Sequence, residues 1–102
     1  RFATEVEKAA ETAGERIWRL PMDADYYEQI KSEVADIKNT GGRQAGSITA
    51  AKFLEVFAKD TPWVHLDIAS VMSAASDKGW MVKGMRGTPV RTLVQLVRGR
   101  AK

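Results

Sequence analysis

The chain has 102 residues, of which 44% are hydrophobic and 28% charged, and its formal net charge is +3. No apolar run approaches the roughly 20 residues that a membrane-spanning helix needs, and residues 1–5 lack the apolar core of a signal peptide. The absence of cysteine excludes disulfides and thiolate metal sites within these residues and fits a reducing compartment. We therefore expect a small globular domain with a cytoplasmic location.

Basic residues gather near the C-terminus, at Arg91, Arg98, Arg100 and Lys102. A nucleic-acid site usually combines such a stripe with aromatic residues, and no aromatic residue follows Trp80. We interpret the stripe as a solvated helix face whose positive charge is favoured by the helix dipole. The sequence predicts no nucleic-acid partner and no membrane partner.

Four helices are predicted, and the first two lie in the N-terminal third of the chain. Residues 2–13 place apolar side chains on one face and charged side chains on the other. Gly14 follows where a left-handed cap is favoured. A second helix is predicted to begin at Asp23 or Asp25 and to continue to Val34 along one apolar face.

The third predicted helix follows a glycine-containing loop at residues 39–42. It starts with Ser47 as N-cap and ends near Lys59. Its side chains are apolar over a wide arc, so we expect burial on more than one side. Glu55 and Lys59, four residues apart, are expected to form an ion pair.

The fourth predicted helix starts at Thr88-Pro89, since proline is favoured at the first helical position. Its expected buried stripe consists of Val90, Leu93, Val94 and Val97.

The strongest strand pattern lies at residues 63–69, where apolar and polar side chains alternate. Residues 17–20 and 34–37 are weaker strand candidates, and residues 73–87 are predicted to form mainly loop. A lone strand cannot satisfy its own backbone hydrogen bonds. The partner strands must therefore come from the weaker segments or from outside the chain, in an α/β fold.

Known catalytic motifs are not found in the sequence. The glycine-rich segment 41–46 precedes a helix but lacks the lysine and hydroxyl pair of a phosphate-binding loop. We interpret it as a turn that lets the backbone approach a neighbour closely. His65, the only histidine, lies on the same predicted strand face as Asp67. Such a pair can tune a general base, but a buried, hydrogen-bonded structural histidine is the preferred interpretation.

Four segments carry a family resemblance. They are residues 15–22, the Ala-Asp-x-x-Asn to Thr-Ala-Ala stretch at 35–51, the His-Leu-Asp-Ile-Ala stretch at 63–72, and residues 83–93. In collinear order over nearly the whole chain, they resemble the C-terminal part of the leucyl aminopeptidase (cytosol aminopeptidase) family of two-metal exopeptidases.

The resemblance implies that residues 1–102 are the C-terminal segment of a three-layer α/β/α catalytic domain with a mixed sheet. This segment is expected to contain mostly helices and one to three strands. The parent enzyme would release N-terminal amino acids from peptides. The upstream part of the same protein and further copies in a homohexamer would be its partners.

The family's cofactors are two divalent metal ions, zinc or manganese, held by a lysine and four carboxylates upstream of everything present here. Asp36 and Asp67 suggest a carboxylate pair of the kind that binds two metals. They match family positions that are not metal ligands, and we expect both to cap loops. The chain alone is therefore predicted to lack metal and catalytic residues and to be inactive.

Three substrate-binding residues follow from the resemblance. Ala69 and Met72 match positions that line the apolar pocket for the substrate's N-terminal side chain, and Thr40 matches a residue bordering the next pocket. Ser70 replaces a residue that is usually glycine in the family, which would narrow or polarise that wall.

Two alternatives remain open from the sequence. The first is a non-catalytic family member that acts as a structural or assembly component. The second is a freestanding binding module, which is disfavoured because the predicted strand lacks evident partners.

Overall fold

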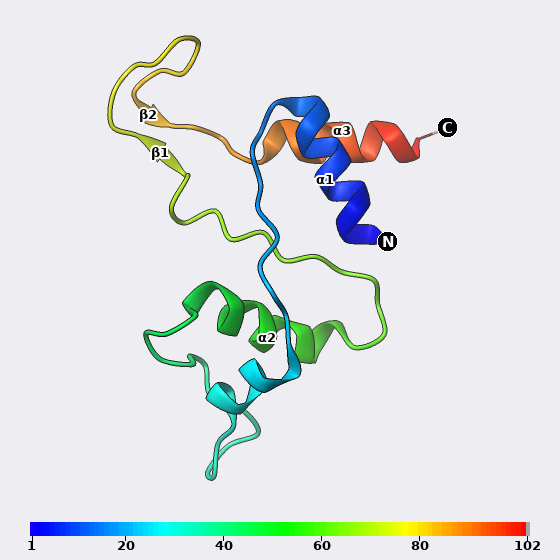
Figure 1. Ribbon diagram of the computed structural model, residues 1–102, viewed down its shortest axis with the longest axis vertical. Helices are drawn as coiled ribbons and strands as arrows, with labels where there is room; N and C mark the ends of the chain where they lie inside the picture. The colour runs from blue at the N-terminus through cyan, green and yellow to red at the C-terminus, as the bar shows by residue number, and fades with distance from the viewer. Residues whose placement is uncertain (102) are drawn as a thin grey trace. The chain divides into compact units, whose positions relative to one another are not determined.

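The computed structural model describes residues 1–101, and the chain divides into two compact units (Figure 1). The first unit combines residues 1–17 with the chain from Leu66 onward, and the second is Trp18–His65. None of the helices in the described part of the chain is long and apolar enough to cross a membrane. The elements in chain order are α1 (Phe2–Ala13), the 3₁₀ helix η1 (Ala24–Ile30), α2 (Gly46–Ala58), β1 (Ser73–Ala74), β2 (Gly84–Met85) and α3 (Val90–Arg100).

Helix α1 agrees with the prediction from its amphipathic pattern. Its buried side is small and apolar, and the chain leaves the helix at Gly14, whose φ of 70° is left-handed. The N–H of Gly14 donates to the carbonyl of Glu11 (3.1 Å), and the N–H of Glu15 donates to that of Ala10 (3.0 Å). This pair of bonds satisfies two carbonyls that the helix end leaves without partners. The buried residues of α1 are Val6, Ala9 and Ala10.

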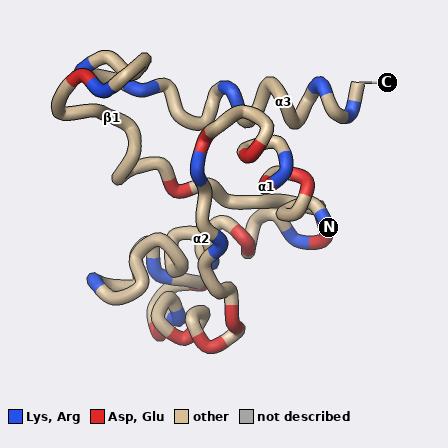
Figure 2. Tube along the Cα trace, turned by 45° about the horizontal axis from the view of Figure 1, so that its top comes forward, with Lys and Arg blue, Asp and Glu red and all other residues tan. Residues whose placement is uncertain are grey.

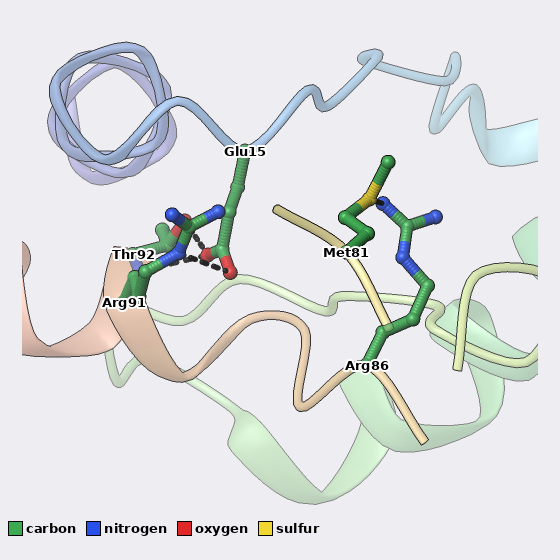
Figure 3. A network of polar contacts seen from close by, with 5 residues as sticks. All are labelled: Glu15, Met81, Arg86, Arg91 and Thr92. Atoms are coloured by element: carbon green, nitrogen blue, oxygen red, sulfur yellow. Dashed lines mark hydrogen bonds and ion pairs between the residues drawn. The ribbon is translucent and has the colours of Figure 1, made fainter. Parts of the chain in front are cut away.

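The side chain of Glu15 joins the end of α1 to the start of α3 (Figure 3). Its Oε2 accepts hydrogen bonds from the N–H of Thr92 (2.9 Å) and from the Thr92 hydroxyl (2.6 Å). The Nε of Arg91 lies 3.5 Å from Oε1. Glu15 is only 9% exposed and Thr92 is fully buried. We refer to these three residues as the Glu15 clamp.

The Glu15 clamp supplies a cap that α3 lacks in its own sequence. The N–H groups of a first helical turn have no intrahelical acceptor, and Pro89, which precedes α3, makes no side-chain cap. The carboxylate of Glu15 accepts one of these N–H groups. Negative charge at this position is also favoured by the helix dipole.

The predicted apolar stripe of α3 does not face the core of its unit, so that expectation was wrong. Thr92 is buried instead, and Leu96 is half-buried on the side that forms a groove with α1. Val90 and Val97, by contrast, are 59% and 65% exposed. The clamp on Thr92 turns this side of α3 toward α1 and leaves the stripe on the opposite side.

The basic end of α3 is only partly a solvated face. Arginine recurs along this helix (Figure 2), and Arg98 is exposed. The guanidinium of Arg100, however, donates to Glu5 Oε2 (2.6 and 3.0 Å) and lies over the ring of Phe2, 4.7 Å from its centroid. Arg100 therefore ties the end of α3 back to the first turn of α1.

The strands lie where a loop was expected. Within the first unit, β1 and β2 pair antiparallel, with Ser73 opposite Met85 and Ala74 opposite Gly84. Asp77 Oδ1 accepts the N–H of Lys83 (2.7 Å) inside the connection. Two backbone bonds between Lys78 and Met81 (2.9 and 3.0 Å) close the same connection. The small and glycine-rich residues of this segment gave no sign of a hairpin in the sequence.

Residues 63–69 form no strand, and neither do residues 17–20 or 34–37. These three strand expectations were wrong for the described chain. The alternating segment 63–69 is paired with no strand of the described chain, and its residues 63–66 are half-buried. A strand requires a neighbour to accept and donate its backbone bonds, and residues 1–101 place none beside it.

In the second unit, η1 is shorter than the predicted second helix and stops at Ile30, which is fully buried. Lys31 is extended, and the Ser32 hydroxyl accepts the N–H groups of Val34 (3.3 Å) and Ala35 (3.1 Å). Such local bonds compete with a continuing helix. Val34 is consequently 97% exposed instead of buried on the helix face.

Helix α2 matches the predicted third helix, but its start and one ion pair differ. It follows Ala45, which has a left-handed φ of 52°, so Ser47 is not the N-cap. Lys52 Nζ lies 2.9 Å from Glu55 Oε2, in place of the expected pair with Lys59. The helix buries one side, consisting of Ile48, Thr49, Ala51 and Lys52. Leu54, Val56 and Phe57 are exposed, so burial on more than one side is not observed.

The Glu15 clamp predicts an acid-sensitive contact. Burial raises the pKa of Glu15, but the hydrogen bonds from Thr92 and Arg91 outweigh it and hold the pKa below its ordinary value of 4.5. A carboxylate with a lowered pKa stabilises the fold above its unfolded-state pKa and loses this contribution as the pH falls through the folded-state value. Hydrogen exchange of the α3 amides should therefore show protection that declines below about pH 4.5.

Glu15→Gln should lower the free energy of opening of α3 by about 1–2 kcal/mol at neutral pH, because a neutral amide replaces a charged acceptor. The matched control is Glu11→Gln on exposed α1 surface, for which we expect little change. Equal protection of α3 in both variants, with the same pH profile, would contradict a stabilising clamp.

Candidate substrate-binding loop

Ala69 and Met72 lie in one loop of the first unit, directly before β1. This Asp67–Met72 loop is shaped by two local hydrogen bonds. Asp67 Oδ1 accepts the N–H of Ala69 (3.0 Å), and the N–H of Val71 donates to the carbonyl of Ile68 (3.1 Å). The first bond is a short Asx turn. The prediction that Asp67 caps a loop is therefore confirmed.

The loop is anchored to the hairpin at its far end. The N–H of Arg86 donates to the carbonyl of Met72 (2.9 Å), which extends the pairing of β1 and β2 by one bond. The side chain of Met72 is 48% exposed, and Ala69 and Ser70 are exposed. The hydrogen-bonded backbone of this loop thus holds two apolar side chains at the surface, the small one of Ala69 and the flexible one of Met72.

Arg86 has a second contact, visible in Figure 3. Its Nη2 lies 2.9 Å from the sulfur of Met81, across the hairpin connection. Sequence reasoning did not single out Arg86, although it lies in one of the four family-like segments. Its role in holding the loop depends on a backbone N–H, which every non-proline residue carries, and no side-chain pattern signals it.

Thr40 is exposed and belongs to the second unit, whereas Ala69 and Met72 belong to the first. The residue after it, Gly41, approaches the first turn of α2. A Cβ on Gly41 would lie 2.7 Å from the Cβ of Thr49, which is closer than real Cβ atoms come. The interpretation of this glycine segment as a close backbone approach is confirmed. Because Gly41 has no side chain, the backbone next to Thr40 can lie directly against Thr49.

His65 is half-buried, so the expectation of a buried histidine was wrong. Its ring lies beside that of Trp63, with the centroids 6.4 Å apart. Asp36 is exposed in a bend, and its predicted role as a loop cap stays a prediction.

The described residues do not fit a metal centre. Within residues 1–101 no group of three or more histidine, aspartate or glutamate side chains converges as a divalent ion requires. Asp67 uses a carboxylate oxygen to hold its own loop. No chemical step is therefore assigned to a metal held by these residues.

Comparison with known proteins identifies the class. The profile of the cytosol aminopeptidase family, catalytic domain, matches residues 1–94. A probable cytosol aminopeptidase of Synechococcus sp. (strain JA-3-3Ab) is 52% identical over 100 residues, which are 98% of this chain and 20% of that protein. A probable cytosol aminopeptidase of Rippkaea orientalis is 54% identical over 94% of the chain, again 20% of the relative.

Solved structures agree with the sequence relatives. The bottromycin maturation enzyme BotP, in complex with Mn, matches 100% of this chain and 23% of its own, with a TM-score of 0.93 and 38% identity. A mutant of tomato leucine aminopeptidase matches 94% of this chain and 18% of its own, with a TM-score of 0.83 and 42% identity. The fold is thus that of an α/β segment of aminopeptidases.

The chain belongs to the cytosol aminopeptidase family and corresponds to part of its catalytic domain. This confirms the resemblance found in the sequence. The chain spans about a fifth of the length of the curated relatives that it matches.

The close approach of Gly41 gives a test of the segment that carries Thr40. Gly41→Ala should destabilise the second unit by about 1–3 kcal/mol, because the added methyl group must displace Thr49. The control is Gly46→Ala in the same unit, where an added Cβ meets nothing within 4 Å. Urea denaturation should show a large loss for the first variant and little loss for the second. Equal stability of the two variants would contradict the steric argument.

Proposed function

We propose that this chain is part of an aminopeptidase that releases N-terminal amino acids from peptides. The observation that carries the proposal is the identity of 52% over 98% of the chain to a probable cytosol aminopeptidase. Residues 1–102 would be an incomplete segment of the catalytic domain. The rest of the same polypeptide would hold the catalytic groups and two divalent metal ions, zinc or manganese. The structural neighbour in complex with Mn supports this choice of cofactor.

The contribution of this segment is a wall of the substrate cleft. Met72 and Ala69 would contact the side chain of the substrate's first residue, and Thr40 would border the next side chain. The exposed, anchored Asp67–Met72 loop supports this role, since leucine-preferring pockets need apolar walls and methionine adapts to varied shapes. Ser70 would add a hydroxyl to this wall.

We further propose a cytoplasmic homohexamer of the full-length protein, with peptides as substrates. The assembly state is measurable by analytical ultracentrifugation of that protein. A hexamer with intact fold and bound metal but no peptidase activity would favour the non-catalytic alternative, a structural or assembly component.

The central test is hydrolysis of leucine p-nitroanilide by the full-length protein. Activity should disappear on treatment with a chelator and return with Mn²⁺ or Zn²⁺. Residues 1–102 alone should show no hydrolysis under any of these conditions. Metal-dependent turnover by this isolated segment would contradict the proposal that the catalytic and metal-binding groups lie outside residues 1–102.

Met72 offers a sharper test of the cleft. Met72→Lys should lower kcat/KM for leucine p-nitroanilide by about 10- to 100-fold, because burial of a leucine side chain contributes about 1.5–3 kcal/mol. Most of the change should appear in KM. Met85→Lys is the matched control, since Met85 is also exposed but lies on β2. Similar kinetics for the two variants would remove Met72 from the cleft.

A further inference from the structure

The side of α3 that points away from α1 is a continuous apolar surface. Its four residues recur at three- and four-residue spacing, so they share one face of the helix. We call it the outer face of α3; it consists of Val90, Leu93, Val94 and Val97, which are 59%, 46%, 49% and 65% exposed.

Two of the three arginines of α3 are engaged away from this face, and the third, Arg98, lines the groove with α1. Arg91 lies beside the carboxylate of Glu15 and over the ring of Trp80, 4.2 Å from its centroid. Arg100 is bound to Glu5 on α1. An apolar stripe along one side of a helix normally packs against another part of the fold. Helix α1 lies on the other side of α3, and no described element of the first unit covers the outer face.

We propose that the outer face of α3 packs against the part of the same catalytic domain that lies outside residues 1–102. This inference rests on the proposed function. The whole fold of this chain recurs with a TM-score of 0.93 inside BotP, where it accounts for only 23% of that chain. More than three quarters of such a polypeptide is therefore available to supply the missing layer.

A second copy of the chain is a poorer occupant. The second unit independently leaves Leu54 and Phe57 exposed on α2, at 44% and 66%. A single symmetric contact uses one patch on each copy, whereas the larger part of a catalytic domain can cover apolar surfaces on both units. The outer face also carries no charge with which to specify a polar interface.

Thiol labelling of the full-length protein tests the inference. Residues 1–102 contain no cysteine, so a single cysteine placed there gives a unique labelled peptide. The variants are Leu93→Cys and Val97→Cys on the outer face. The matched control on the same helix is Arg98→Cys, since Arg98 is exposed and a long charged side chain is rarely buried.

The outer-face cysteines should react with a maleimide at least about tenfold more slowly than the control, because labelling requires local opening. This difference should survive about 100-fold dilution, since an intramolecular contact does not depend on concentration. Labelling of all three variants at the same rate would overturn the inference. So would protection that disappears on dilution, because it would show that a second copy covers the face.

Two further measurements distinguish misfolding of the variants, loss of the packing contact and absence of enzymatic activity. If the cysteine variants do not fold, hydroxyl-radical oxidation of the unsubstituted full-length protein reports Leu93 directly; oxidation equal to that in urea would overturn the inference. Peptidase activity is measured on the same preparation. Protection without activity would reject the proposed function and retain the packing, whereas activity without protection would do the reverse.

Discussion

The contact on which the first unit depends is the hydrogen bonding of Glu15 to Thr92. The Schellman-type turn at Gly14 brings Glu15 out of α1, and its carboxylate caps the first turn of α3. Because this bond fixes which side of α3 meets α1, it also determines that the valine- and leucine-rich side faces outward. A polar contact thus decides the direction of the apolar surface. This explains how a helix with an ordinary apolar stripe comes to show that stripe to solvent within its own unit.

Much of the helical content was predictable, because its causes are local. The spacing of apolar residues in 2–13 and the glycine after it correctly predicted α1 and its left-handed end. The glycines before α2 likewise indicated a close backbone approach, which the contact of Gly41 with Thr49 confirms. The family could be recognised because its motifs cover nearly the whole chain. The Asx turn at Asp67 followed from the tendency of aspartate to cap loops, although the segment itself was predicted to be a strand.

The errors arose where the outcome depends on distant residues. Alternation at 63–69 describes a chain suited to a sheet, but a strand exists only when another strand pairs with it, and residues 1–101 offer none there. The stripe of α3 was correctly identified as apolar. Its direction depended on Glu15, 77 residues earlier in the chain. The hairpin of β1 and β2 was missed because its strands are short and its residues have weak strand preference. Its connection is closed by the bond from Lys83 to Asp77 and by the backbone bridge between Lys78 and Met81.

The first unit is discontinuous in sequence: its two parts are separated by the whole second unit, Trp18–His65. During synthesis α1 leaves the ribosome well before α3, so it is exposed without its main packing partner until α3 has been made. The second unit is a single contiguous stretch and can form as soon as it has emerged. Bringing α1 and α3 together closes a long loop of chain. This loop closure costs conformational entropy before the stabilising contacts between the two helices form. The α1–α3 pair is therefore expected to be a late event in folding, completed only after translation has delivered the C-terminal helix.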